Sequence, residues 1–226
     1  MFIEQGIKPE NKFWKYILGF LLFMIAYTIG QVPFTLAVLY KSTSMGHGIP
    51  TDPSELMNVL DSNLKLFLLL LTFVAAFIGI YIAVRYINQQ KFIEIVTARK
   101  KVDWNRVFFS FSLWAVFTIV SIAIMYYTSP QDFVVNFNLV PFLGFAVIAI
   151  LLIPIQTSTE EFVFRGYLMQ GFGTLFLNKW APLLTTSVLF GLMHIFNPEV
   201  DKIGYIILIY YIGTGLFLGI ITLMDD

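Results

Sequence analysis

Long apolar runs separated by short polar stretches set the pattern of this sequence. A helix needs about 20 apolar residues to cross the ~30 Å hydrocarbon layer of a membrane. Runs that reach or approach this length cover residues 16–40, 66–84, 107–127, 139–155, 183–196 and 205–224. The pattern predicts an all-α fold, a polytopic transmembrane helix bundle of about six spans. We interpret residues 1–226 as one membrane domain, with three spans and a basic loop in 1–127.

The distribution of Lys and Arg predicts how these spans cross the membrane. Basic residues concentrate in the N-terminal tail and in the loop 85–106, and basic loops favour the cytoplasmic side. The loop 128–138 has no Lys or Arg and is expected outside. Counting the spans onward places 156–182 in the cytoplasm and 197–204 outside. We therefore expect an integral membrane protein with a cytoplasmic N-terminus.

Composition supports a membrane protein and removes several kinds of chemistry. Charged residues make up 12% of the chain, against about 25% in soluble domains. The 14 Lys and Arg balance the 14 Asp and Glu, so no net charge attracts nucleic acid. The absence of Cys excludes disulfides, thiolate metal sites and Cys nucleophiles. Of the two histidines, His47 lies in a loop rich in Gly, Ser and Thr, where we expect it to be solvated, and His194 lies in an apolar run.

One charged cluster, Glu160, Glu161 and Arg165, lies among large apolar residues. Ionised groups inside a membrane cost roughly 2.5–3.5 kcal/mol each on insertion scales, so the cluster needs a reason. On a helix, Glu161 and Arg165 are four residues apart and share a face, which suits an ion pair. Glu160 is directed about 100° away and is free to face a cavity, as a general base would.

A structural interpretation of the same residues also exists. Ser158-x-x-Glu161 has the form of a capping box, and acidic residues favour the first turn of a helix. The two glutamates would then only begin a helix that carries the motif beyond the fourth span. This interpretation does not explain Arg165.

His194 is the second polar intrusion, in the sequence Phe190-Gly-Leu-Met-His194. A histidine inside a membrane segment needs a polar neighbour because lipid supplies none. Glu160 is the best candidate for that neighbour. In the last run, the small-residue step from Gly215 to Gly219 predicts a close-packing face for another helix.

The order and spacing of these motifs resemble those of a known family. Glu160-Glu161-x-x-x-Arg165, followed about 25 residues later by Phe190-x-x-x-His194, is similar to the CPBP family of CAAX prenyl proteases and bacteriocin-processing enzymes, also called the Abi family. The resemblance identifies 139–226 as a CPBP-like core. It implies an intramembrane endopeptidase, in a bacterial plasma membrane, that cleaves a peptide or protein substrate.

The resemblance also implies roles for individual residues. Glu160 and His194 would be catalytic, with Glu160 activating water and His194 as its partner. Glu161 and Arg165 would hold the helix, and Phe190 would line the site. A divalent metal such as zinc, bound by Glu160 and His194, is a cofactor that the resemblance allows. Membrane lipid would surround the protein, and the sequence carries no clear signal for an oligomeric state.

One departure from the family pattern leaves other functions open. The family has a further His-x-x-x-Asn motif on a later helix, and no histidine follows His194 here. Asn197 lies at a span edge and does not replace that motif. We interpret the difference as truncation, which leaves the core incomplete at its C-terminus. The alternatives are a catalytically inactive scaffold or bacteriocin-immunity-like protein on the same fold, and a small transporter with a Glu160–His194 proton relay.

Overall fold

The computed structural model describes residues 2–46 and 53–224, and the described chain is a bundle of helices without strands. His47 lies outside the described residues. The α-helices are α1 (Phe13–Ser44), α2 (Pro53–Asn58), α3 (Ser62–Ile82), α4 (Ile93–Val96), α5 (Trp104–Thr128), α6 (Leu139–Glu161), α7 (Met169–Phe176), α8 (Trp180–Leu192), α9 (Pro198–Ile203) and α10 (Ile207–Met224). Short 3-10 helices cover Ile3–Gly6 and Pro130–Asp132, and π-helices cover Ala83–Ile87 (η2) and Phe162–Leu168 (η4).

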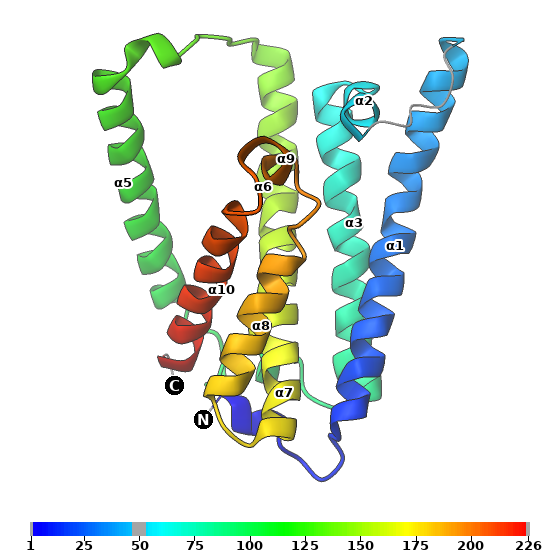
Figure 1. The fold of residues 1–226 in the computed structure, drawn as a ribbon, viewed down its shortest axis with the longest axis vertical. Coiled ribbons are helices and arrows are strands. Elements are labelled where there is room, and N and C mark those ends of the chain that lie inside the picture. Colours follow the sequence, from blue (N-terminus) through cyan, green and yellow to red (C-terminus); the bar gives the residue numbers. More distant parts are fainter. Residues whose placement is uncertain (1, 47–52, 225–226) are drawn as a thin grey trace.

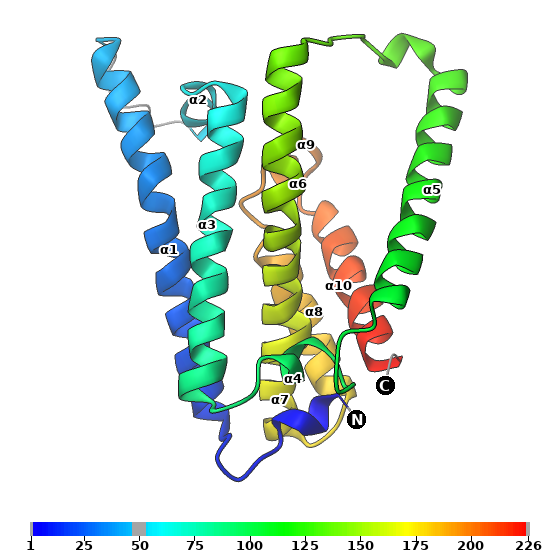
Figure 2. The ribbon, with the colours of Figure 1, turned by 180° about the vertical axis from the view of Figure 1, so that it is seen from behind.

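The long helices stand side by side, with the N-terminus and the end of α10 at the same end of the bundle (Figure 1). Helix α3 packs between α1 and α6, and the shorter α8 and α10 pack against each other. Small residues let α1 and α3 approach closely, since a Cβ at Gly30 would lie 2.9 Å from the Thr72 backbone. Helix α5 has no buried residue and stands apart from the others over most of its length (Figure 2).

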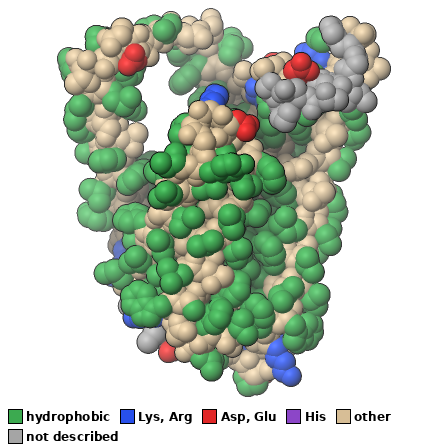
Figure 3. All heavy atoms as spheres, in the orientation of Figure 1, with side chains coloured by type: hydrophobic (Ala, Val, Ile, Leu, Met, Phe, Trp, Pro, Cys, Tyr) green, Lys and Arg blue, Asp and Glu red, His purple; other side chains and the backbone are tan. Residues whose placement is uncertain are grey.

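The predicted fold class is confirmed. Within the described residues, five helical segments are long and apolar enough to cross a membrane. Apolar side chains cover the middle of the visible face, as expected for a surface in contact with lipid (Figure 3). The fifth apolar run of the sequence forms α8, whose 13 residues extend about 20 Å, less than the ~30 Å of the hydrocarbon layer.

The charged motif does not begin a new helix. Helices α6, η4 and α7 form one continuous helical segment, Leu139–Phe176, and Glu160 and Glu161 end its α6 part. The capping interpretation is therefore wrong. Thr157 and Thr159 instead donate hydrogen bonds to carbonyls one turn back, at 3.1 and 2.6 Å, which satisfies their hydroxyls inside a helix.

The connection from α8 to α10 lies partway along the bundle. Both views place α9 partway along α6, well short of the end where α2 lies (Figures 1 and 2). The short length of α8 accounts for this position, and the expectation that 197–204 lies outside stays a prediction. Non-helical backbone at this depth is tolerated where it lines a cavity or is buried in protein.

A buried polar network fixes the end of the bundle that holds the N-terminus. Gln170 donates to the backbone carbonyls of Phe2 and Glu94 at 3.3 and 2.7 Å and accepts from Gln90 at 3.0 Å. Tyr167 donates to the Asn88 side chain at 2.7 Å. These bonds join the N-terminal segment, the chain after α3 and the helix that carries the charged motif. Which side of the membrane this end faces stays a prediction.

Candidate functional site

Glu160 and His194 line the same cavity, which has a volume of about 200 Å³. It lies between α1, α3, the α6–η4 junction and the end of α8. The other lining residues are Phe23, Met24, Tyr27, Phe73, Gln156, Phe164, Phe190, Met193 and Asn197. A carboxylate and an imidazole thus line one mostly aromatic and aliphatic cavity, and their catalytic roles stay a prediction.

Glu160 points into this cavity from the last turn of α6. Gln156, one turn earlier, donates its side-chain amide to the Glu160 carboxylate at 3.3 Å. A single neutral donor orients the carboxylate and leaves its other lone pairs available to a water molecule or substrate.

Glu161 and Arg165 form the ion pair that their spacing suggested, at 3.0 Å between Oε1 and Nη1. The Arg165 side chain is 4% exposed, and the Glu161 side chain is 39% exposed. The guanidinium carbon also lies 4.1 Å from the centre of the Phe190 ring, a cation–π contact. The pair therefore ties the α6–η4 junction to α8, and Phe190 takes part in this contact as well as lining the cavity.

The π-helix η4 comes directly after the two glutamates. Single π turns inside α-helices are rare and often occur at functional sites. Here the wider turn carries both Phe164 and Arg165 toward Phe190 of α8. The centres of the Phe164 and Phe190 rings lie 5.3 Å apart, and the rings meet edge to face. On the other side, a Cβ at Gly166 would collide with the backbone carbonyl of Ile95, so this position admits only glycine without a shift of the chain.

His194 lies in the turn after α8, one turn of chain beyond Phe190. Its Nδ1 is 2.7 Å from the Phe190 carbonyl oxygen. A carbonyl only accepts hydrogen bonds, so Nδ1 carries the proton in this contact. In the neutral imidazole, Nε2 is then the nitrogen that holds the free lone pair.

Several residues of the site were missed by the sequence interpretation. Asn197, which the sequence placed at a span edge, lies in the cavity wall. Gln156 could have been found, since it lies one helical turn before Glu160 in an apolar stretch. Tyr27 and Phe73 come from α1 and α3, and no local pattern connects them with the motifs.

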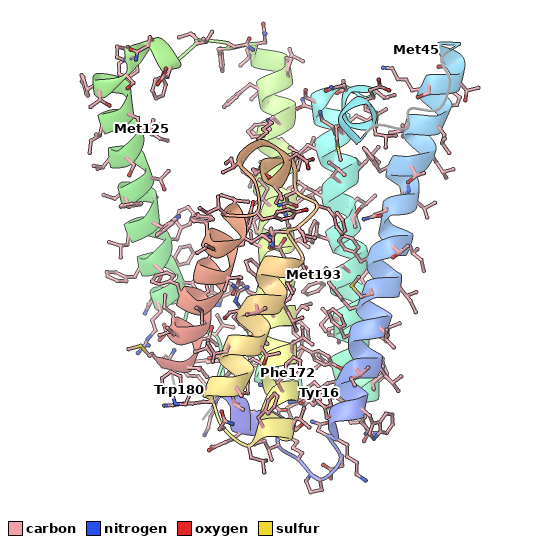
Figure 4. The ribbon with its side chains drawn as sticks, in the orientation of Figure 1. Tyr16, Met45, Met125, Phe172, Trp180 and Met193 are labelled. Atoms are coloured by element: carbon pink, nitrogen blue, oxygen red, sulfur yellow. The ribbon has the colours of Figure 1, made fainter. Side chains whose placement is uncertain are left out.

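A second pocket, wholly apolar and about 210 Å³ in volume, adjoins the first. The two share Phe164 and Met193 in their walls. Tyr16 and Phe172 line the second pocket and lie between α1 and α7, below Met193 (Figure 4). The polar cavity thus has an apolar neighbour on the side toward the N-terminal end of α1.

The donor set at the cavity does not complete a zinc site. Catalytic zinc usually takes three protein ligands and a water molecule. Among the described residues, no group of three or more His, Asp or Glu side chains is placed to hold a metal ion. Glu160 and His194 supply two donors, so metal binding by this pair stays a prediction, and no chemical step is derived through a metal.

Fold and site together define a class: a polytopic helical membrane protein with a carboxylate–imidazole cavity at a π-helical turn. Residues 139–226 match the model of a family described as type II CAAX prenyl endopeptidase Rce1-like. The chain is also 31% identical over 199 residues to a Bacillus subtilis (strain 168) protein called Uncharacterized protein YyaK. No solved structure matches the chain.

Residues 139–226 are thus similar to the Rce1-like family, which confirms the resemblance first seen in their motifs. The match with the Bacillus relative covers 88% of this chain and 66% of the relative's length.

Proposed function

We propose that this protein is an intramembrane endopeptidase of the CAAX protease type. The observation that carries the proposal is the cavity that Glu160 and His194 share, beneath a helix junction held by an ion pair. The match of residues 139–226 to the Rce1-like family model supports the same reaction class. The substrate would be a peptide or protein, and the protein would reside in a bacterial plasma membrane with its N-terminus in the cytoplasm.

Hydrolysis in this cavity would use Glu160 as the general base. The carboxylate accepts a proton from a water molecule, and the water oxygen attacks the carbonyl carbon of the scissile peptide bond. The C–N bond then breaks, and the proton passes to the departing amine. His194, with its Nδ1 proton held by the Phe190 carbonyl, presents Nε2 as an acceptor from the water or, when protonated, as a donor to the amine.

The apolar pocket beside the cavity suits the side chain of a substrate residue next to the scissile bond. Its wall has no polar surface, and it opens beside the residues that would perform the reaction. An extended peptide would have to expose its carbonyl to Glu160 while an apolar side chain fills this pocket. Helix α1 supplies much of the pocket wall, so α1 would take part in substrate binding.

The test is cleavage of a membrane-associated peptide library by the purified protein in lipid nanodiscs, with products identified by mass spectrometry. Glu160→Gln should lower the rate about 100-fold or more, because a positioned general base contributes typically 10²–10⁴-fold. Glu199→Gln, the same change on the exposed surface of α9, is the matched control. Cleavage by Glu160→Gln at the rate of the Glu199→Gln protein would show that Glu160 is not the base.

A catalytically inactive membrane scaffold, or a bacteriocin-immunity-like protein on the same fold, is a second candidate. The Glu161–Arg165 ion pair and its contact with Phe190, which join helices without taking part in a reaction, suit this role. A scaffold keeps its biological effect when Glu160 and His194 are both replaced by glutamine, whereas a protease loses it. Complementation of a deletion strain with the double variant therefore separates the two candidates.

A further inference from the structure

The imidazole of His194 is held by more than its own helix. The ring of Tyr211, from α10, lies 4.2 Å from the His194 ring, centre to centre, with an angle of 20° between the two planes. The Phe190 ring lies 4.7 Å from the imidazole at an angle of 55°. Stacking at this distance restricts rotation of the imidazole about its side-chain bonds.

The same tyrosine also holds the turn in which His194 lies. Its hydroxyl accepts a hydrogen bond from the Asn197 side-chain amide at 3.4 Å. Asn197 precedes α9 and lines the cavity. Its backbone N–H donates to the His194 carbonyl at 3.0 Å. Tyr211 therefore contacts both polar side chains of this turn, His194 through its ring and Asn197 through its hydroxyl.

Close packing of α8 and α10 brings Tyr211 to this height. A Cβ at Gly191 would collide with the side chain of Ile212, the residue after Tyr211. One turn further on, a Cβ at Gly215 would lie 3.0 Å from the backbone of Ser187. Both contacts lie on one side of the stacked pair, before His194 in α8 and after Tyr211 in α10, and together they fix the register of the two helices.

We propose that Tyr211 is a positioning residue for His194. Its ring fixes the plane of the imidazole, and its hydroxyl, through Asn197, fixes the turn, so that Nε2 addresses the cavity that holds Glu160. The inference rests on the proposed function for its catalytic consequence. The positioning itself is a property of the protein without substrate, and it can be measured there.

The first measurement is the tautomer of His194 by ¹⁵N NMR. The chain has two histidines, so the background substitution His47→Asn leaves His194 as the single labelled ring. We expect a fixed Nδ1–H tautomer in this parent and in the control Tyr205→Leu, which alters an exposed tyrosine shortly before α10. In Tyr211→Leu we expect exchange-averaged ring signals. Tyr211→Phe keeps the stacked ring and should keep the tautomer.

The second measurement is the rate of peptide cleavage by the same variants. Tyr211→Leu should lower kcat about 10- to 100-fold with little change in KM, because misplacing a reacting group acts on the chemical step. Tyr211→Phe should show a smaller loss, caused by release of Asn197. A structural role alone would lower the yield of folded protein and leave the kcat of the folded fraction unchanged.

The possible failures are distinguishable. If Tyr211→Leu keeps both the fixed tautomer and the parent kcat, the positioning role is overturned. If the parent protein cleaves nothing and Tyr211→Leu still loses the tautomer, the proposed function fails and the positioning stands.

Discussion

Replacing Glu161 with methionine should destabilise the protein more than replacing its ion-pair partner Arg165 with methionine. The two side chains are 3.0 Å apart but unequally buried, with 4% of Arg165 and 39% of Glu161 exposed. Loss of Glu161 leaves a buried guanidinium without its anion. Loss of Arg165 leaves a carboxylate that is still partly exposed.

The magnitudes reflect this asymmetry. Breaking a buried pair by removing one partner costs typically about 3–5 kcal/mol, so about 3 kcal/mol is expected for Glu161→Met. For Arg165→Met we expect about 1–2 kcal/mol, mostly from the lost contact with the Phe190 ring. The double variant should be more stable than Glu161→Met alone, because replacing both charges with apolar groups removes the unpaired buried charge.

The assay is reversible unfolding in mixed micelles of dodecyl maltoside and sodium dodecyl sulfate, monitored by tryptophan fluorescence. Glu199→Met, on the exposed surface of α9, is the control for the substitution itself. A double-mutant cycle gives the coupling between the two side chains. Two results would refute the reasoning: equal destabilisation by the two single variants, or free energies that simply add in the double variant.

Two further variants test the packing around the site. Gln170→Leu removes three hydrogen bonds from a fully buried side chain, one of them to the Glu94 carbonyl. It should lower the free energy of unfolding by about 3 kcal/mol. The control Gln131→Leu, at an exposed position, should change the free energy of unfolding by nearly nothing. Gly215→Ala should lower both the stability and the cleavage rate, because the added Cβ meets the α8 backbone. Gly213→Ala should change neither, because no atom lies within 4 Å of a Cβ at that position. Equal behaviour of the two variants would contradict the packing argument.

Local patterns predicted the spans and the motif, because both depend on residues close together in the sequence. A run of apolar residues specifies a membrane helix whatever its neighbours are, and a four-residue spacing places Glu161 beside Arg165 on a helix. The interpretation of the sequence failed where the same residues are compatible with two local structures. Thr157 and Thr159 can cap a helix or bond back to it, and only the surrounding packing selects the second.

The depth of the turn after α8 could not be predicted, because it depends on contacts between distant segments. Residues 183–196 are apolar enough to suggest a span, yet α8 ends at Leu192. The turn beyond Leu192 is held by Tyr211, which lies seventeen residues after His194 in the sequence. No local signal in the sequence links Asn197 or Tyr211 to the Glu160 motif.

Helix α10 does not line the cavity, but it supports the turn that does, and the short length of α8 is the reason. Helix α8 ends at Leu192, so His194 lies in the turn that follows the helix, and this turn lines the cavity. Ending a helix inside the bundle exposes its last carbonyls and the turn after it. The Phe190 carbonyl meets that need by bonding the His194 ring, and α10 supplies Tyr211 to the turn. The contacts that satisfy the interrupted helix are therefore the same ones that orient the imidazole, so weakening the α8–α10 contact should reduce catalysis before it unfolds the bundle.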